Sequence, residues 1–454
     1  MSAARALVVV IGVAVCAPAA AAEGGLKRWG ELEGDVGFGF MGSDLFTTLQ
    51  AGFDLQEGGF AMGLQLRLRL RVADGGDEHE GKGVRREDWD EPSDLAHILR
   101  YVSYRRKVKS VSVGLLLGEH AGYTLGYGTL IRDYSSAMDI DHPHSGVATR
   151  LSGRHWQLDF FLDDVVAPEL TALRVLTRPI VGRHNLLVGA TGVFDFRVPV
   201  AAVTDEDGAR QVDSKRNLVV ERGLLGAVGV DVGYLLGDGE ENHLATYVTG
   251  NLLIPEKHRG DPAAGLHLGV RFGVRPFGGQ LRVFGGVEYR RLGAGYMPSY
   301  VDLIYDVQRL QFPLTAQAAS SAENAPTKLG AVVGGLAPAG NAWWGQLGVQ
   351  YGRWFEASVH YEHRPGLLGQ GLGARASVVV GRWFLASVLL EWFGMDAPDA
   401  ERARGLLASA EARVRPTKRT YLLAQYSRLW HLSQTGLYRP LDQLNVAFGV
   451  AWGY

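Results

Sequence analysis

The chain has 454 residues, a formal net charge of −2 at pH 7 and 61 glycines. A charge so close to neutral excludes the basic surface that nucleic-acid-binding proteins need. Beyond the first 22 residues, no apolar run approaches the about 18 residues of a membrane-spanning helix, which excludes a helical membrane protein. A membrane β-barrel is not excluded, because polar residues that face the lumen interrupt the apolar pattern of each strand.

Residues 1–22 have the pattern of a secretory signal peptide. Arg5 supplies the positive charge, residues 7–15 form a short apolar run, Pro18 ends it, and alanines at 19–22 offer a cleavage site. The apolar run is too short to span a bilayer. The only cysteine, Cys16, lies within this segment. We therefore expect a mature chain, residues 23–454, without disulfides or thiol chemistry.

Residues 60–72 show the clearest strand pattern of the chain. Phenylalanine, methionine, leucine and valine occupy every even position, while Arg67, Arg69 and Arg71 share the opposite face with small or polar residues. Because side chains alternate between the faces of a strand, one face is apolar and the other is charged. Turning the arginines toward lipid would cost about 2–4 kcal/mol each near the bilayer midplane. The pattern predicts a spanning strand with arginines in the lumen, although one strand alone would also suit a soluble antiparallel sheet.

The same alternation recurs in residues 111–117, 156–162, 266–274 and 281–290. An internal repeat also occurs at a spacing of 29 residues, where Gly-Arg-Trp-Phe at 352–355 returns at 381–384. Each copy predicts a tight turn that leads into a strand, with Trp354 and Trp383 near a membrane interface. The alternative is a duplicated hairpin with ordinary core tryptophans.

Connections between the predicted strands alternate between short and long. The long ones are residues 74–94, 119–145, 197–217 and 292–342, and most short ones contain glycine or proline. Outer-membrane barrels have short periplasmic turns and long extracellular loops. The sequence therefore predicts one all-β domain over 23–454, an up-and-down antiparallel transmembrane β-barrel. We count about 20 strands, with 16 or 18 as alternatives, and place both termini in the periplasm.

The C-terminal segment, residues 444–454, alternates large apolar residues with small or polar ones and ends on an aromatic residue. It resembles the closing strand of bacterial outer-membrane β-barrels of the porin-like class. The resemblance covers this strand, the signal segment and the alternating pattern, and it reaches no particular family. It implies that Phe448, Trp452 and Tyr454 form the membrane-insertion signature and that the barrel-assembly machinery and lipopolysaccharide are partners.

Lumen-facing arginines are the main candidates for function. The predicted pore-lining residues are Arg67, Arg69, Arg71, Arg271, Arg275, Arg282 and Arg290. Basic side chains around a water-filled pore favour anions. Carboxylates such as Asp159 and Glu288 fall on the same face, so structural ion pairing across a mixed lumen is the competing interpretation. Both interpretations stay open.

The longest predicted loop contains a second set of candidates, Tyr300, Asp302, Tyr305 and Arg309. Val301, Ile304 and Val307 recur at helical spacing within it. We predict a short helix that folds into the pore mouth as a constriction or lid, with tyrosines able to stack on sugar faces. A solvated surface loop is the alternative.

Other chemistry has little support in the sequence. Asp139, Asp141, His142 and His144 have ligand-type side chains, but they match no known metal-ligand spacing. The first three could join Ser145 in a hydrolytic site, which their spacing does not specify. We therefore expect no enzyme, no metal and no cofactor, and interpret the chain as an outer-membrane channel for small hydrophilic solutes, anions among them. The alternatives are an exporter of acidic polysaccharide and a barrel-borne surface hydrolase. The oligomeric state is left open.

Overall fold

The computed structural model describes residues 29–75, 83–182, 184–237, 242–257, 259–276, 279–312, 314, 326–366, 369–396 and 405–453. The predicted signal segment, residues 1–22, and Tyr454 of the predicted insertion signature lie outside these ranges. None of the helices in the described ranges is long and apolar enough to cross a membrane.

Within the described residues, one sheet of 21 strands forms a closed barrel. Twenty strands make the wall, each antiparallel to its neighbours, and the two-residue β4 (Gly83–Val84) is attached only to β3. The wall strands are β1 (Trp29–Met41), β2 (Asp44–Glu57), β3 (Phe60–Ala73), β5 (Leu99–Val108), β6 (Val111–Gly118), β9 (Gly146–Ser152), β10 (Trp156–Leu162), β11 (Leu170–Ile180), β12 (His184–Ala202), β13 (Val220–Gly237), β14 (His243–Pro255), β15 (Ala263–Val274), β16 (Leu281–Leu292), β17 (Gly340–Tyr351), β18 (Phe355–His363), β19 (Gln370–Val380), β20 (Phe384–Phe393), β21 (Leu406–Val414), β22 (Thr420–Leu432) and β23 (Tyr438–Gly453). The predicted 20-stranded up-and-down barrel is confirmed.

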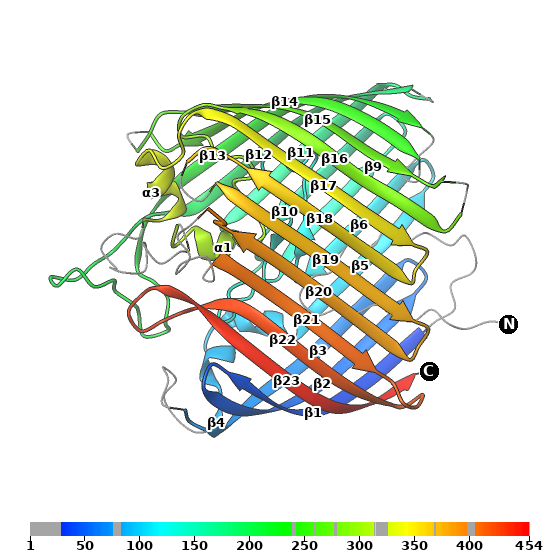
Figure 1. Cartoon of the computed structure of the whole chain (residues 1–454), viewed down its shortest axis with the longest axis vertical. Coiled ribbons are helices and arrows are strands. Elements are labelled where there is room, and N and C mark those ends of the chain that lie inside the picture. The colour runs from blue at the N-terminus through cyan, green and yellow to red at the C-terminus, as the bar shows by residue number, and fades with distance from the viewer. Residues whose placement is uncertain are drawn as a thin grey trace.

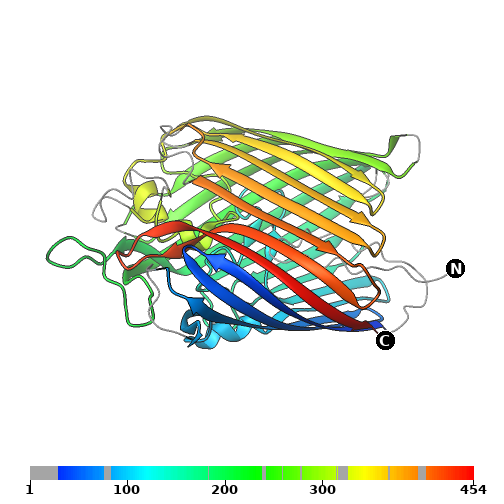
Figure 2. The same cartoon turned by 60° about the horizontal axis from the view of Figure 1, so that its bottom comes forward.

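The barrel closes between its first and last strands. β1 and β23 pair in continuous register from Glu31 opposite Gly453 to Met41 opposite Gln443. Figure 2 shows the blue β1 beside the red β23. Because β1 begins where β23 ends, both strands reach the same end of the barrel, which we call the turn end. The helices α1 (Tyr305–Gln308) and α3 (Lys328–Val333) lie at the opposite end, the loop end (Figure 1).

The two faces of the wall differ in polarity, as the alternation predicts. On β15, Leu266, Leu268 and Val270 point outward and are 43%, 42% and 36% exposed. His267 and Arg271, at odd-numbered positions of the same strand, point inward. Outward apolar side chains are exposed on strands all around the barrel, from β1 to β23. Water would penalise such a belt, whereas the hydrocarbon of a bilayer solvates it.

The internal repeat forms two equivalent turns at the turn end. Gly352 and Gly381 have φ values of +52° and +57°, a region that glycine adopts without the steric cost of a side chain. β18 follows the first turn and β20 follows the second. The adjacent Trp354 and Trp383 are 39% and 49% exposed. The repeat is therefore a glycine turn that leads into a spanning strand, as predicted.

The wall is uneven in height. β12 and β13 have 19 and 18 residues, whereas β6 has eight and β9 and β10 have seven each. A tilted transmembrane strand usually needs about 9–11 residues. On this low side, η1 (Arg86–Asp88), η2 (Pro92–His97) and the connection 119–145 continue above the strand ends. The low side therefore depends on irregular chain to complete the wall.

Two connections fold inward at the loop end and fill it. The first, residues 119–145, contains the hairpin of β7 (Ala121–Tyr123) and β8 (Tyr134–Ser135). The second, residues 293–339, contains α1 and α3. One buried apolar cluster joins both connections to β10–β14, and a second joins α1 to β20–β23. The two connections thus contact opposite sides of the barrel.

Candidate functional site

Residues 124–133, here called the inserted segment, reach the lumen wall that β13–β16 form. The Tyr127 ring stacks on Tyr247 of β14, with ring centroids 3.9 Å apart and planes inclined by 6°. Leu130 lies against Gly229 of β13, and a side chain at position 229 would leave little room for the leucine. The inserted segment therefore packs on inward-facing residues instead of covering the rim.

The end of the inserted segment continues toward β17–β19. The Arg132 guanidinium lies over the Trp344 ring, 4.1 Å from its centroid, and donates to Glu288 at 3.1 Å. The Asp133 carboxylate lies 3.4 Å from Arg375 of β19. The segment thus contacts strands from β13 to β19 and narrows the lumen in front of them.

Glu288 of β16 is fully buried and organises the wall behind the segment. It accepts hydrogen bonds from Arg132 and from the Tyr247 hydroxyl, at 3.1 and 2.5 Å, and pairs with Arg290. His267 Nδ1 lies 2.9 Å from the same carboxylate. A buried carboxylate is tolerated only when such partners offset its lost hydration. The network holds Arg132, and hence the inserted segment, in one place.

The predicted mouth residues lie in the second inward connection. Tyr305 donates its hydroxyl to Asp195 of β12 at 2.6 Å. Arg309 lies 2.7 Å from Glu169 and 3.3 Å from Asp195. The predicted short helix is present as α1, and all four of its side chains are buried.

Tyr300 and Asp302 belong to the same packed unit. Lys328 of α3 donates to Asp302 at 3.0 Å, and its ammonium lies 5.3 Å from the Tyr300 ring centroid. Burial lowers the pKa of the Lys328 ammonium, although the Asp302 carboxylate opposes this shift. Tyr300 is 2% exposed and Tyr305 is inaccessible to solvent. These rings stabilise the folded loop, and in this conformation neither presents a face to a solute.

His144 joins the two inward connections. Its ring nitrogens lie 3.7 Å from Asp164, which follows β10, and 3.9 Å from Asp306 of α1. Tyr134 donates to the same Asp306 at 3.0 Å. Burial raises the pKa of the neighbouring Asp163 to about 7, with His144 acting in the opposite direction. The loop end therefore contains a charged junction that spans both connections.

Asp139, Asp141 and His142 form contacts that fix the first connection near β22 and β23. Asp139 lies 3.1 Å from His142 Nδ1 and accepts the Tyr438 hydroxyl at 2.7 Å. Asp141 pairs with Arg85. Burial disfavours the imidazolium of His142, but the Asp139 carboxylate outweighs burial and raises the pKa of His142 to about 9. Among the described residues, no group of three or more His, Asp or Glu side chains is arranged to hold a metal ion.

Three of the predicted pore-lining arginines lie on β3 and point inward. Arg67 donates to the Gln50 side chain at 3.2 Å. Arg69 lies 3.0 Å from Asp88, and Arg71 lies 3.2 Å from Asp44. Arg69 and Arg71 are buried in these ion pairs, which is what the interpretation of structural ion pairing predicts. Arg67 is only partly buried and contacts a neutral amide oxygen.

The other four predicted arginines lie on or beside β15 and β16. Arg271 donates to the Tyr127 carbonyl at 2.6 Å and so contacts the inserted segment. Arg290 is fully buried between Glu288 and Glu362. Arg282 lies over the Phe284 ring, 5.5 Å from its centroid, and Arg275 is half-buried where β15 ends. Arg271 therefore lies at the narrowed region of the lumen. Arg290 is a buried ion-pair partner of two carboxylates.

Sequence reasoning missed a basic group on the low side of the wall. Arg105 of β5 and Arg150 of β9 both stand opposite Gly114 of β6, so the three residues share the inward face. Both arginines are exposed, and Arg150 lies 2.5 Å from Asp159. The alternation of β6 could have placed Gly114 inward, but the register of its neighbours could not be derived from the sequence.

No protein-family model matches the chain, and no curated protein sequence matches it. Solved structures that resemble it include OmpT, an outer-membrane protein of Vibrio cholerae, at 11% identity and a TM-score of 0.34, covering 94% of this chain and 97% of that one. The outer-membrane protein OpdK of Pseudomonas aeruginosa has 10% identity and a TM-score of 0.35, covering 94% and 99%. OccAB4 of Acinetobacter baumannii has 7% identity and a TM-score of 0.33, covering 94% and 99%.

These likenesses are too distant to assign a solute or a mechanism. The chain's own strand pairing and its two-faced wall define its class. A closed antiparallel barrel with an apolar exterior and a charged interior is a transmembrane β-barrel of the outer-membrane type.

Proposed function

We propose that the protein is a passive channel for small hydrophilic solutes across the outer membrane of a Gram-negative bacterium. The observation that carries this proposal is the exposed polar face inside an otherwise apolar-coated barrel. Arg105, Ser112 and Arg150 point inward on β5, β6 and β9 and are exposed to solvent. Charged side chains at such positions need water, and a water-filled lumen is the path that a hydrophilic solute would take.

The inserted segment supplies the selectivity in this proposal. A solute that passes along the lumen must pass between the segment and the remaining wall. Arg271 contacts the segment, whereas Arg67 stands on β3, and among the described residues each donates to a neutral oxygen instead of a carboxylate. A guanidinium without a carboxylate partner keeps its attraction for an anion and can bind a carboxylate through two parallel hydrogen bonds. We therefore propose a preference for anionic solutes, carried by Arg67 and Arg271.

Insertion and surroundings follow from the same interpretation. The apolar belt supports contact with outer-membrane lipids, lipopolysaccharide among them, and Phe448 and Trp452, 56% and 50% exposed, face outward on β23 as the predicted insertion signature requires. Export through the Sec pathway, recognition by the barrel-assembly machinery and any oligomer formation belong to this proposal.

Planar-bilayer recording of the refolded protein tests the channel and its selectivity together. We expect a stable open conductance and a reversal potential displaced toward the anion equilibrium potential under a KCl gradient. Arg67→Ala and Arg271→Ala should each move the reversal potential toward zero, because each removes a positive charge from the path. Arg291→Ala is the matched control, since Arg291 is exposed on the outward side of β16.

The outcomes separate the two parts of the proposal. Cation-selective current would retain the channel and reject the assignment of the two arginines. Resistance to unfolding in cold detergent shows that the barrel has folded. A folded protein that gives no conductance would reject the channel itself.

A further inference from the structure

The wall has an opening between β3 and the low side. β3 pairs with β5 only as far as Leu64 opposite Leu99, and with β4 only from Leu70 opposite Val84. Between these two points, the Gln65 amide donates to the Ile98 carbonyl and the Arg85 amide donates to the Arg69 carbonyl. Residues 66–68 of β3 are therefore left without a ladder partner on that side among the strands that the structure describes. A ladder gap exposes a strip of the wall that would otherwise be covered by a neighbouring strand.

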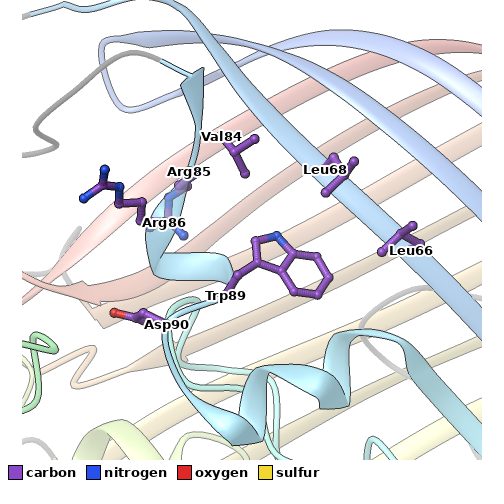
Figure 3. A pocket seen from close by; sticks show the side chains of 7 residues that line it. All are labelled: Leu66, Leu68, Val84, Arg85, Arg86, Trp89 and Asp90. Atoms are coloured by element: carbon purple, nitrogen blue, oxygen red, sulfur yellow. The ribbon is translucent and has the colours of Figure 1, made fainter.

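A pocket of about 540 Å³ occupies the outer side of this gap. The residues that line it are Leu66 and Leu68 of β3, Val84, Arg85 and Trp89, with Arg86 and Asp90 at its rim (Figure 3). The Trp89 ring points toward the two leucines, whereas Arg86 and Asp90 point away from them (Figure 3). Its volume is in the range of pockets that hold small ligands.

Ion pairs on the inner side of the same segment keep the pocket from closing. Asp88 points inward to Arg69 of β3 at 3.0 Å and to Arg85 at 2.5 Å, while Trp89, the next residue, lines the pocket. Arg85 is fully buried and also pairs with Asp141 of the inward connection. The position of the segment is therefore set from inside the barrel, independently of what fills the pocket outside.

The location of the pocket identifies its occupant. Leu66 and Leu68 belong to the outward, lipid-facing side of β3 and lie near the middle of the strand, so the pocket is continuous with the apolar belt. At that depth the surrounding solvent is lipid acyl chain. Arg86 is exposed at the rim on the loop-end side, and it has no ion pair with a described residue. An anionic head group would complement the positive charge of Arg86. The Asp90 carboxylate would repel a head group that carries two negative charges close together.

We propose that this pocket binds one acyl chain of an anionic lipid of the surrounding membrane, with Arg86 contacting the head-group phosphate. The site is distinct from the lumen and does not depend on the proposed channel function. It would anchor the lipid where the wall is completed by irregular chain, and so seal the ladder gap against leakage.

Trp89 provides a direct reporter for the test. The full-length protein is reconstituted with phosphatidylglycerol carrying a dibrominated acyl chain, and the Trp89 signal is taken as the difference from Trp89→Phe. We expect saturable quenching of this signal. Phosphatidylcholine with the same chain, and Arg86→Gln with phosphatidylglycerol, should each require about threefold more lipid, the effect of one exposed ion pair.

Filling the pocket provides the second arm. Leu66→Phe should abolish the saturable component, and Leu268→Phe should leave it unchanged, because both leucines are 42% exposed but only Leu66 lines the pocket. Quenching of Trp89 that is non-saturable and insensitive to Leu66→Phe would show ordinary lipid contact and overturn the proposal. A second outcome would also overturn the proposal. If brominated stearate in detergent quenches Trp89 saturably and phosphatidylglycerol cannot displace the stearate, the pocket binds a fatty acid.

Discussion

The side chain of Arg290 is inaccessible to solvent and pairs with Glu288 and Glu362. Removing it takes the Arg290 ion pair from Glu362 and leaves Glu288 with Arg132 as its remaining arginine partner. Breaking a buried pair in this way costs about 3–5 kcal/mol, more than the pair itself contributes, because the remaining charge stays desolvated. We expect Arg290→Met to lower the free energy of unfolding by that amount in urea titrations of the lipid-reconstituted protein.

Arg291 offers the control for this prediction. It is the next residue of β16, points outward, is exposed and donates to the Asn341 side chain at 2.9 Å. Arg291→Met should change the free energy of unfolding by less than about 1 kcal/mol, as for other exposed polar contacts. Equal losses in the two variants would show that the buried network around Glu288 does not stabilise the barrel.

His142 makes the packing of the first inward connection dependent on pH. Burial disfavours its charged form, but Asp139 raises the pKa to about 9, above the value of 6.5 for a free histidine. A raised pKa means that the ion pair contributes its full stability below pH 6.5 and loses it as the pH rises through 9. Hydrogen exchange of residues 136–146, corrected for its intrinsic pH dependence, should accelerate across that interval.

The variant His142→Gln isolates this effect. It cannot carry the charge, so its corrected exchange should be fast already at pH 6 and flat up to pH 9. A steep profile that survives in the variant would show that a group other than His142 causes the pH dependence.

At the scale of elements, the inserted segment is the feature that we expect to limit the width of the lumen. Replacing residues 124–133 by two glycines removes the contacts with Tyr247, Glu288 and Arg375 and clears the space in front of β14–β19. We expect the single-channel conductance to increase, because less of the cross-section is then obstructed. The measurement is the planar-bilayer recording used for the proposed channel.

The hairpin tip at residues 206–208 provides a matched deletion. Glu206 and Asp207 are exposed at the tip of the connection between β12 and β13, and within the described residues the tip forms hydrogen bonds to Asp205 of its own turn. Shortening it should leave the conductance unchanged. An unaltered conductance in the variant that lacks residues 124–133 would show that the inserted segment does not limit the path.

The strands could be predicted from the sequence and the inserted segment could not, for a physical reason. Alternation has a period of two residues, so a strand such as β3 carries its own evidence in a dozen neighbouring positions. The inserted segment is specified by contacts such as Tyr127 on Tyr247, which are remote in sequence and have no period. A long glycine-containing connection therefore indicates a loop without indicating on which side of the rim it packs.

The same distinction explains the predicted arginines. Their inward direction follows from the alternation, and the structure confirms it for Arg67, Arg69 and Arg71. Whether each guanidinium meets a carboxylate depends on strand register and on the connections. Arg69 meets Asp88, which lies in η1 and not on a neighbouring strand. The pore-lining role of these residues stays a prediction that the reversal potentials will test.

At the scale of the whole molecule, the barrel is asymmetric around its axis. The apolar core of the two inward connections packs against the tall side, β12–β14. The low side, β5–β10, carries the exposed arginines inside and the pocket outside, next to η1. Because both inward connections also contact β19–β23, they join the two sides at the loop end. The proposed solute path and the proposed lipid site therefore fall on the side of the wall that packing fills least.

The position of the membrane can be tested on a single strand. Val270 lies near the middle of β15 and Val274 is its last residue before the turn end, and both point outward. An arginine that faces lipid costs about 2–4 kcal/mol at the midplane and about 0–1 kcal/mol near the interface. Val270→Arg should therefore lower the free energy of unfolding in lipid vesicles by that larger amount, and Val274→Arg by the smaller. In detergent micelles, which adapt to a charge, the difference should shrink. Equal costs in vesicles would contradict a bilayer that spans β15, because the two substitutions share residue type, strand and face and differ only in depth.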